Sequence, residues 1–349
     1  MILTPPFPLL TKRGESKRPP LTLRSGYAAL SPANTRSTMQ QHTVQTPYMV
    51  GEVHFYSTEL ESGLALFDTG PPTDEGRARL LESVDLANLK YLLITHCHVD
   101  HYGLANFILQ QSNAEVFVPR RDVIKFQRHA ERMERIGEIL SDYGFGSEFT
   151  ARLRESFEKN KLFPVTPERF RIVEESEELA RLGVTYLSCP GHSQSDLVYV
   201  VDNCAVTGDI LLKNIFQAPL LDINLENFTE RFRNYDSYCS SLLNIAQLRG
   251  RNILPGHRRN IESVDSAILY YVTTLLERAK QLSPFRRLSI SDIVKQLFKG
   301  RLTEPFLIYL KVSEIVFMLD FLENPNLLKS SLEQIGMFDA VSHLYEAVA

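Results

Sequence analysis

The feature that most constrains this chain is a run of four metal-binding side chains within six positions, inside residues 94–103. Apolar residues 91–94 precede the run and a second apolar stretch, 104–109, follows it, which predicts a buried strand, a tight loop and then a helix. The four side chains are His96, His98, Asp100 and His101. A polar loop rarely combines these residues at this spacing by chance, so the pattern indicates a metal site.

The spacing within the run predicts that its side chains face two separate points. Side chains alternate along an extended segment, so His96 and His98 project to the same side at the end of the strand. Asp100 and His101 follow where the chain turns into the helix, and they can face a second point nearby. Imidazole and carboxylate suit zinc, iron or manganese, and this many ligands in one loop favours two metal ions over one.

Three more candidate ligands lie near the ends of later strand-like runs, each with a glycine one residue before it. They are His192 after residues 184–188, Asp209 after residues 204–207 and His257 after residues 252–254. Glycine permits the tight turn that such a strand end requires.

The motif Thr95-His-Cys-His-Val-Asp-His, followed by these three residues in this order, resembles the metallo-β-lactamase superfamily over roughly residues 48–260. The resemblance implies an α/β (α+β) fold, a four-layer αββα sandwich with the metals at one edge of the sheets. It also implies the ligand set: one ion held by His96, His98 and His192, a second held by Asp100, His101 and His257, and Asp209 bridging the two.

A predicted hairpin opens this region. Two strand-like runs, 49–56 and 64–67, flank a glycine turn, and the second run ends at Asp68. By the same resemblance, Asp68 supports a metal ligand through a hydrogen bond. The alternative is an aspartate that only starts a turn.

Three regions are predicted along the chain: 1–45, a catalytic domain at 46–260, and a helical extension at 261–349. Residues 1–45 hold six prolines and a net charge of +5, from six basic residues and one acid, so the formal −4 of the whole chain leaves −9 on residues 46–349. The first region is too polar to fold alone. A disordered tail or a mis-set start before Met39 is favoured over a transit-like peptide, and no secretory signal is evident.

Residues 122–161 read as a helical insertion, two helices joined by a Gly-rich aromatic turn at 143–146. One interpretation is a substrate lid over the metal site that carries Tyr143, Phe145 and Phe149. The other is a helical pair that packs on the edge of the sandwich.

The extension at 261–349 contains amphipathic helical runs and resembles the winged-helix-like appendage of some superfamily members. Few basic residues line these helices and the body is acidic, so we expect packing or homodimer formation and no nucleic-acid partner. No apolar run approaches a membrane span, and the four scattered cysteines fit a cytoplasmic protein. Cys97, between two ligands, is expected to be an inert buried thiol.

The resemblance implies a hydrolase whose two divalent ions, with zinc expected and iron or manganese also compatible, share a bridging hydroxide as nucleophile. Asp100 would orient that hydroxide and accept its proton. The expected substrate is a small molecule with an activated acyl bond, a thioester or a lactone. The alternatives are a mononuclear-iron persulfide dioxygenase, a phosphodiesterase, and a partner-binding regulator that retains its metals.

Overall fold

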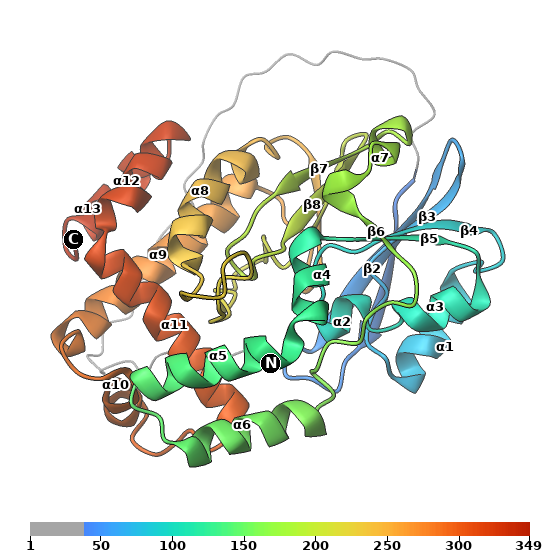
Figure 1. The fold of residues 1–349 in the computed structure, drawn as a ribbon. Helices are drawn as coiled ribbons and strands as arrows, with labels where there is room; N and C mark the ends of the chain where they lie inside the picture. Colours follow the sequence, from blue (N-terminus) through green and yellow to red (C-terminus); the bar gives the residue numbers. More distant parts are fainter. Residues whose placement is uncertain (1–37) are drawn as a thin grey trace.

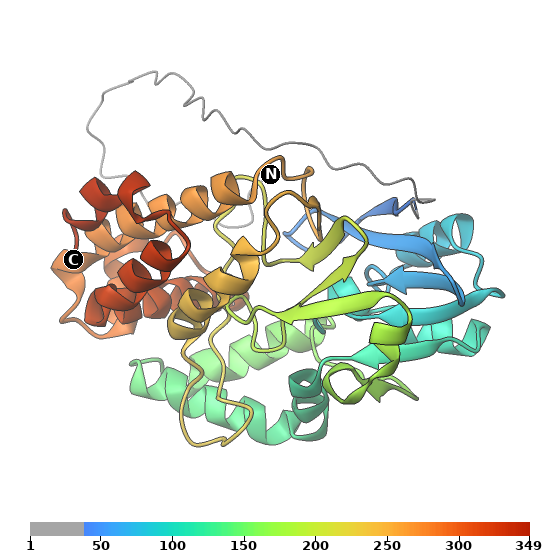
Figure 2. The same cartoon turned by 90° about the horizontal axis from the view of Figure 1, so that it is seen from above.

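The structure, a computed structural model, describes residues 38–349. Two β-sheets face each other, and helices cover their outer sides (Figures 1 and 2). The predicted αββα sandwich with a C-terminal helical extension is confirmed. From residue 38 onward, none of the helices combines the length and apolar character of a membrane span.

The first sheet has six strands in sequence order. They are β1 (Gln40–Gln45), β2 (Glu52–Leu60), β3 (Gly63–Phe67), β4 (Leu89–Leu93), β5 (Glu115–Val118) and β6 (Arg171–Ile172). Strands β1 to β3 are antiparallel, whereas β3 to β6 run parallel. The outer side of this sheet packs on α1 (Asp74–Ser83), α2 (Val99–Tyr102), α3 (Ala105–Gln111) and α4 (Arg120–Gln127).

The second sheet has the order β10-β9-β8-β7. Its strands are β7 (Val184–Ser188), β8 (Leu197–Val201), β9 (Cys204–Gly208) and β10 (Asn252–Pro255), with the short α7 (Glu178–Arg181) before β7. Strands β7 and β8 are antiparallel, as are β8 and β9, and β10 is parallel to β9. Strands β7, β9 and β10 therefore end at the same edge of the sheet.

Alternation along β8 shows how the layers are joined. Leu197, Tyr199 and Val201 belong to the core between the two sheets, whereas Val198 and Val200 face the helices on the other side. A strand buried on both faces needs apolar residues at every position, and β8 has them. The helices on that outer side are α8 (Asn234–Ala246) and α9 (Val264–Leu282).

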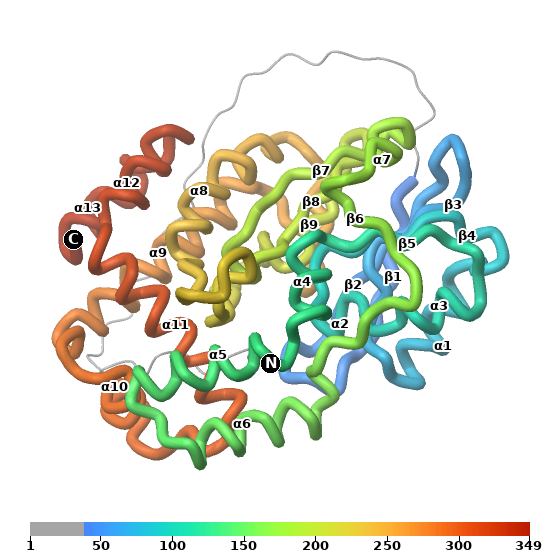
Figure 3. The backbone as a smooth tube through the Cα atoms, viewed as in Figure 1, coloured from blue at the N-terminus to red at the C-terminus, as the bar shows by residue number. Residues whose placement is uncertain are grey.

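The insertion and the C-terminal extension meet each other. The insertion forms α5 (His129–Asp142) and α6 (Ser147–Lys159) after α4, and the extension adds α10 (Ile290–Phe298), α11 (Pro305–Glu323), α12 (Pro325–Gln334) and α13 (Ser342–Tyr345). Helix α11 packs against α6, α8, α9, α10 and α12, so one hydrophobic core runs from the second sheet into the extension (Figure 3).

Several boundaries differ from the sequence-based prediction. Residues 40–45, assigned to the N-terminal tail, form β1, an edge strand in which His42 bonds Ser57 (Nε2–Oγ, 2.8 Å) and only Val44 is apolar. The rest of that prediction, through residue 37, lies outside the described residues.

No strand follows β10 in the described chain, so the extension lacks the β-wing of a winged helix. Helix α8 was not predicted because its serines and asparagines obscure its apolar stripe.

Candidate metal centre

The seven predicted ligands come together where strand ends of both sheets meet. His96 and His98 follow β4, and Asp100 and His101 lie on α2 directly after them. The others follow the three second-sheet strands that end at one edge: His192 after β7, Asp209 after β9 and His257 after β10. The two sheets thus bring together segments that lie more than 150 residues apart in sequence.

The ligand atoms form three groups, each within 4.8 Å, that could hold a metal ion. One group is His96, His98 and His192, another is Asp100, His101 and His257, and between them lie His96, His101 and Asp209. The first two groups match the two sets implied by the family resemblance, and the third places Asp209 between them. The ligand roles themselves stay predictions.

Hydrogen bonds determine which nitrogen of three rings carries the proton. The Nδ1 atoms of His192 and His257 lie 2.7 and 2.6 Å from the backbone oxygens of Ala218 and Glu52. A carbonyl oxygen only accepts, so each Nδ1 donates. His101 Nδ1 likewise donates to Asp68 Oδ2 at 2.9 Å. In the neutral ring, each Nε2 therefore presents a lone pair to the centre.

The Nε2 atoms of His101 and His257 lie close to each other and to one carboxylate oxygen of Asp209. His101 Nε2 lies 3.3 Å from His257 Nε2, and both lie 3.4 Å from Asp209 Oδ1. That carboxylate oxygen is buried and has no hydrogen-bond partner within residues 38–349. Nitrogen lone pairs and a carboxylate oxygen aimed at one point are the donor set of a divalent cation, so these residues fit one.

The electrostatics of the cluster divide its histidines into two kinds. Burial opposes the charge of Asp209, but the His257 and His101 rings outweigh it and hold the pKa of its carboxyl well below the usual range. Burial and the neighbouring rings lower the pKa of His96 and His98. Burial opposes the charge of His101 and His257 as well, but the Asp209 and Asp100 carboxylates outweigh it and raise the pKa of both rings, so a divalent ion that binds here would displace their protons.

Asp68, at the end of β3, lies behind the cluster. Its Oδ1 accepts a hydrogen bond from Thr95 N at 2.8 Å, and its Oδ2 accepts from Thr95 Oγ1 at 2.8 Å and from His101 Nδ1 at 2.9 Å. This contact with a predicted ligand is the one expected of a supporting carboxylate.

Two glycines are required by space. A Cβ atom on Gly256 would lie 2.5 Å from His101 Cε1 and 2.9 Å from Asp209 Oδ1. A Cβ on Gly208, whose φ is +49°, would lie 2.8 Å from Thr95 Oγ1. Gly256, the residue before His257, therefore leaves the space that His101 and Asp209 occupy, in addition to any role in turning the chain.

Two supporting residues were missed by the sequence-based analysis. His54 on β2 contacts the Arg258 carbonyl oxygen through Nε2 at 2.5 Å, next to His257, and its backbone nitrogen donates to Gly256 O at 2.7 Å. Asp122 on α4 accepts from Cys97 N at 2.8 Å, inside the metal-binding loop. Each lies in a strand or helix whose neighbouring residues form no recognisable motif. The only signal in the sequence was therefore the residue type itself.

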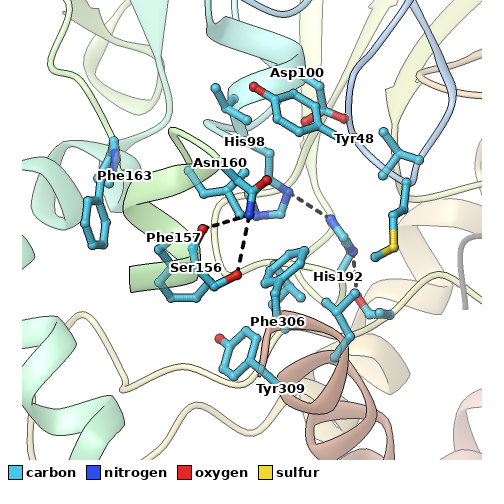
Figure 4. Close-up of a pocket in the computed structure, with 18 of the residues that line it drawn as sticks. Tyr48, His98, Asp100, Ser156, Phe157, Asn160, Phe163, His192, Phe306 and Tyr309 are labelled. Carbon is cyan, nitrogen blue, oxygen red and sulfur yellow. Dashed lines mark hydrogen bonds between the residues drawn. The ribbon is translucent and has the colours of Figure 1, made fainter. Parts of the chain in front are cut away.

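A cavity of about 670 Å³ opens onto the cluster (Figure 4). His98, Asp100, His192, Asp209 and His257 line one end of it. The insertion contributes to its wall, but through residues other than the three aromatic ones predicted for a lid.

Tyr143, Phe145 and Phe149 do not line this cavity. The turn that carries Tyr143 and Phe145 packs on the start of α10, where Ser291 N donates to Tyr143 O at 3.0 Å, and Phe149 lies on α6. The turn between α5 and α6 therefore packs on the extension, and the role of these three residues in a lid stays a prediction.

Cys97 is buried in the core behind the first sheet. Burial and the nearby Asp122 carboxylate raise the pKa of its thiol well above the ordinary value. A thiol that stays protonated is a poor nucleophile, which supports the prediction of an inert residue.

Comparisons with known proteins agree with this geometry. Residues 53–257 match the family model of the metallo-beta-lactamase superfamily. A probable metallo-hydrolase of Bacillus subtilis (strain 168), YqjP, is 25% identical over 297 residues, which cover 80% of this chain and 90% of that protein.

Two crystal structures share the fold over most of the chain. The metallo-beta-lactamase family protein TTHA1429 from Thermus thermophilus has a TM-score of 0.63 at 22% identity, covering 82% of this chain and 94% of its own. A beta-lactamase domain protein from Burkholderia ambifaria also has a TM-score of 0.63, at 17% identity, covering 82% and 86%.

Proposed function

The chain belongs to the metallo-β-lactamase superfamily, and on that premise we propose that it is a dinuclear metal-dependent hydrolase that cleaves a thioester or a lactone. The observation that carries the proposal is the cluster of seven His and Asp side chains at the end of a cavity. Its ligand groups offer places for two ions that share Asp209, which suits zinc and is also compatible with iron or manganese.

Two divalent ions, when bound, would activate a water molecule and polarise the scissile carbonyl. The chain itself supplies orientation and proton transfer. Asp100 Oδ2 lies 3.4 Å from His257 Nε2, and the residue also lines the cavity. Burial opposes the charge of its carboxyl, but the His101 and His257 rings lower the pKa, so Asp100 is ionised and can accept a proton.

Hydrolysis joins the water oxygen to the acyl carbon and breaks the bond from that carbon to sulfur or to the ester oxygen. Asp100 accepts the proton that the water loses and can pass it to the departing thiolate or alkoxide. The free acid remains at the cluster end of the cavity. No covalent enzyme intermediate is required, so the chain needs no nucleophilic side chain.

The other functions consistent with the sequence have less support. A single iron held by two His and one Asp would use three of these seven side chains and leave the other four without a metal ion. A phosphodiesterase would face an acidic body, −9 over residues 46–349. The homodimer and the absence of a nucleic-acid partner stay predictions.

The test combines metal analysis with a substitution. We expect about two divalent ions per chain and turnover of thioesters or lactones. Asp100→Asn should lower kcat/KM by roughly 10²–10⁴-fold, because the amide cannot accept the proton. The control is Asp74→Asn on exposed α1, which should retain activity.

The outcomes separate the alternatives. One iron per chain, with oxygen consumption on a persulfide and no hydrolysis, would replace the hydrolase with the dioxygenase. Two metals with no turnover on thioesters, lactones or a phosphodiester would favour the partner-binding regulator.

A further inference from the structure

The cavity beside the metal cluster is built by three parts of the chain that are distant in sequence. Its wall includes Phe157 from α6 and Phe306, Tyr309 and Leu310 from α11, opposite the ligand end. Figure 4 shows His98, Asp100 and His192 in one part of the cavity, with the Tyr48 ring beside Asp100, and the rings of Phe157, Phe306 and Tyr309 in another. The C-terminal extension thus forms part of the space in which a substrate of the cluster would lie.

Three rings join the insertion to the extension at this wall. The Phe157 ring centroid lies 5.7 Å from that of Phe306 and 5.8 Å from that of Tyr309, in edge-to-face contacts. Aromatic contacts of this kind give a firm, apolar surface. Phe216 and Leu220, from the loop after β9, add to the apolar lining.

Most polar groups of the cavity wall away from the cluster already have partners within the protein. Ser156 Oγ donates to Glu304 at 2.6 Å, and the Tyr309 hydroxyl donates to the Leu221 carbonyl oxygen. Arg132 Nε bonds both oxygens of Asp222, at 2.8 and 2.9 Å. A polar acyl group placed here would find few free partners and would lose its hydration without compensation.

Among the buried polar atoms of this wall away from the cluster, His129 Nδ1 is the exception. This nitrogen is without a hydrogen-bond partner among the described residues, and the His129 ring packs on Phe163 with centroids 4.9 Å apart. Burial and nearby arginines lower the pKa of this ring to about 4, so it is neutral near pH 7. A neutral ring against an aromatic side chain leaves the wall free of net charge at this point.

We propose that the cavity binds a medium- or long-chain aliphatic acyl group, with its carbonyl at the metal cluster and its chain between α6 and α11. The proposal rests on the hydrolase function for the reaction, but the chain-binding surface stands on its own geometry. A cavity of about 670 Å³ lies within the range that encloses a ligand of this size. The extension would then determine substrate choice as well as packing on the sandwich.

The direct test is equilibrium binding of the reaction products. Butanoate, octanoate and dodecanoate are titrated by calorimetry into the purified protein with its metals. Each methylene that enters an apolar site should tighten binding by about fourfold, the equivalent of ~0.8 kcal/mol, until the cavity is full. A dissociation constant that does not change with chain length would overturn the proposal.

Substitutions at the wall locate the site. Leu310→Trp should weaken dodecanoate binding by at least about tenfold and leave butanoate unchanged, because the added ring occupies the far part of the cavity. The matched control is Leu288→Trp, at a half-exposed position outside the cavity. Equal effects of the two substitutions, or a loss of butanoate binding with dodecanoate retained, would contradict the assignment.

A second pair covers the case in which Leu310→Trp does not fold. Phe306→Ala should also weaken dodecanoate selectively, while Phe338→Ala, a half-buried phenylalanine away from the cavity, should not. Binding that depends on chain length, without hydrolysis, would support the acyl site and contradict the hydrolase function. Hydrolysis of short-chain thioesters, without binding that depends on chain length, would support the hydrolase function and contradict the acyl site.

Discussion

Asp68 shows how one backbone conformation serves the metal centre. Its φ is +60°, in the left-handed region that aspartate tolerates better than most residues other than glycine. In this conformation the carboxylate accepts hydrogen bonds from Thr95 and from His101 Nδ1. Since His101 donates through Nδ1, its Nε2 is left to coordinate, and Asp68 thereby selects the tautomer of a predicted ligand.

Asp68→Asn should therefore weaken metal binding without removing a ligand. The amide would turn a donor toward either Thr95 or His101, both of which already donate to this position. We expect a loss of roughly 10–100-fold in metal affinity, measured by competition with a chelator of known affinity. Asp85→Asn, on an exposed turn after α1, is the control. An unchanged affinity in Asp68→Asn would show that the carboxylate is not needed to orient His101.

At the scale of the elements, Glu304 joins the extension to the insertion. One of its oxygens caps α11 by accepting from Leu307 N at 2.6 Å, and the other accepts from Ser156 Oγ of α6 at 2.6 Å. Capping satisfies a backbone donor that the first turn of a helix leaves free. A single side chain thus stabilises the start of α11 and connects it with α6 at the wall of the cavity.

Glu304→Ala should lower the free energy of unfolding by about 1–2 kcal/mol, since it removes the cap and leaves Ser156 without its acceptor. Urea denaturation followed by circular dichroism measures this change. Glu333→Ala, on an exposed face of α12, should have a much smaller effect. Equal destabilisation by the two substitutions would mean that the connection between α6 and α11 contributes little.

At the scale of the whole molecule, the candidate metal centre lies where the two sheets meet. His96, His98, Asp100 and His101 follow a strand of the first sheet, and the other three predicted ligands follow strands of the second. Bound ions would therefore cross-link the sandwich at one edge. Metal that binds only the folded chain adds its binding free energy to the stability of the fold.

Removal of metal should accordingly lower the melting temperature. With free metal at about 1,000 times the dissociation constant, the loss is near 4 kcal/mol, which we expect to appear as a fall of roughly 5–10 °C. Scanning fluorimetry with and without a chelator measures it, and zinc should restore the original value. In Asp209→Ala the response to chelator should be greatly reduced. An identical melting temperature with and without chelator would argue against ions that link the sheets.

Local spacing was enough to predict the framework of the molecule. Short apolar runs predicted β3, β7 and β9, and the apolar residues on either side of the ligand run predicted a strand and a helix where β4 and α3 lie. Side-chain direction in a strand depends only on position along the chain, so neighbouring ligands could be assigned to one side from sequence alone. The family resemblance then added the distant ligands, which the structure places in the same cluster.

The tertiary structure alone decided what surrounds the cluster. Tyr143, Phe145 and Phe149 lie outside the cavity wall, and the turn that begins at Tyr143 bonds α10, about 145 residues later in sequence, a partner that no local pattern specifies. The contact of His54 with the loop that carries His257 could not be predicted either, because the two segments are about 200 residues apart in sequence. The sequence by itself determined the fold class and the candidate ligands, since both follow from short-range spacing and a known motif. The cavity wall formed by α6 and α11 arises from contacts between distant segments, and only packing in three dimensions could reveal it.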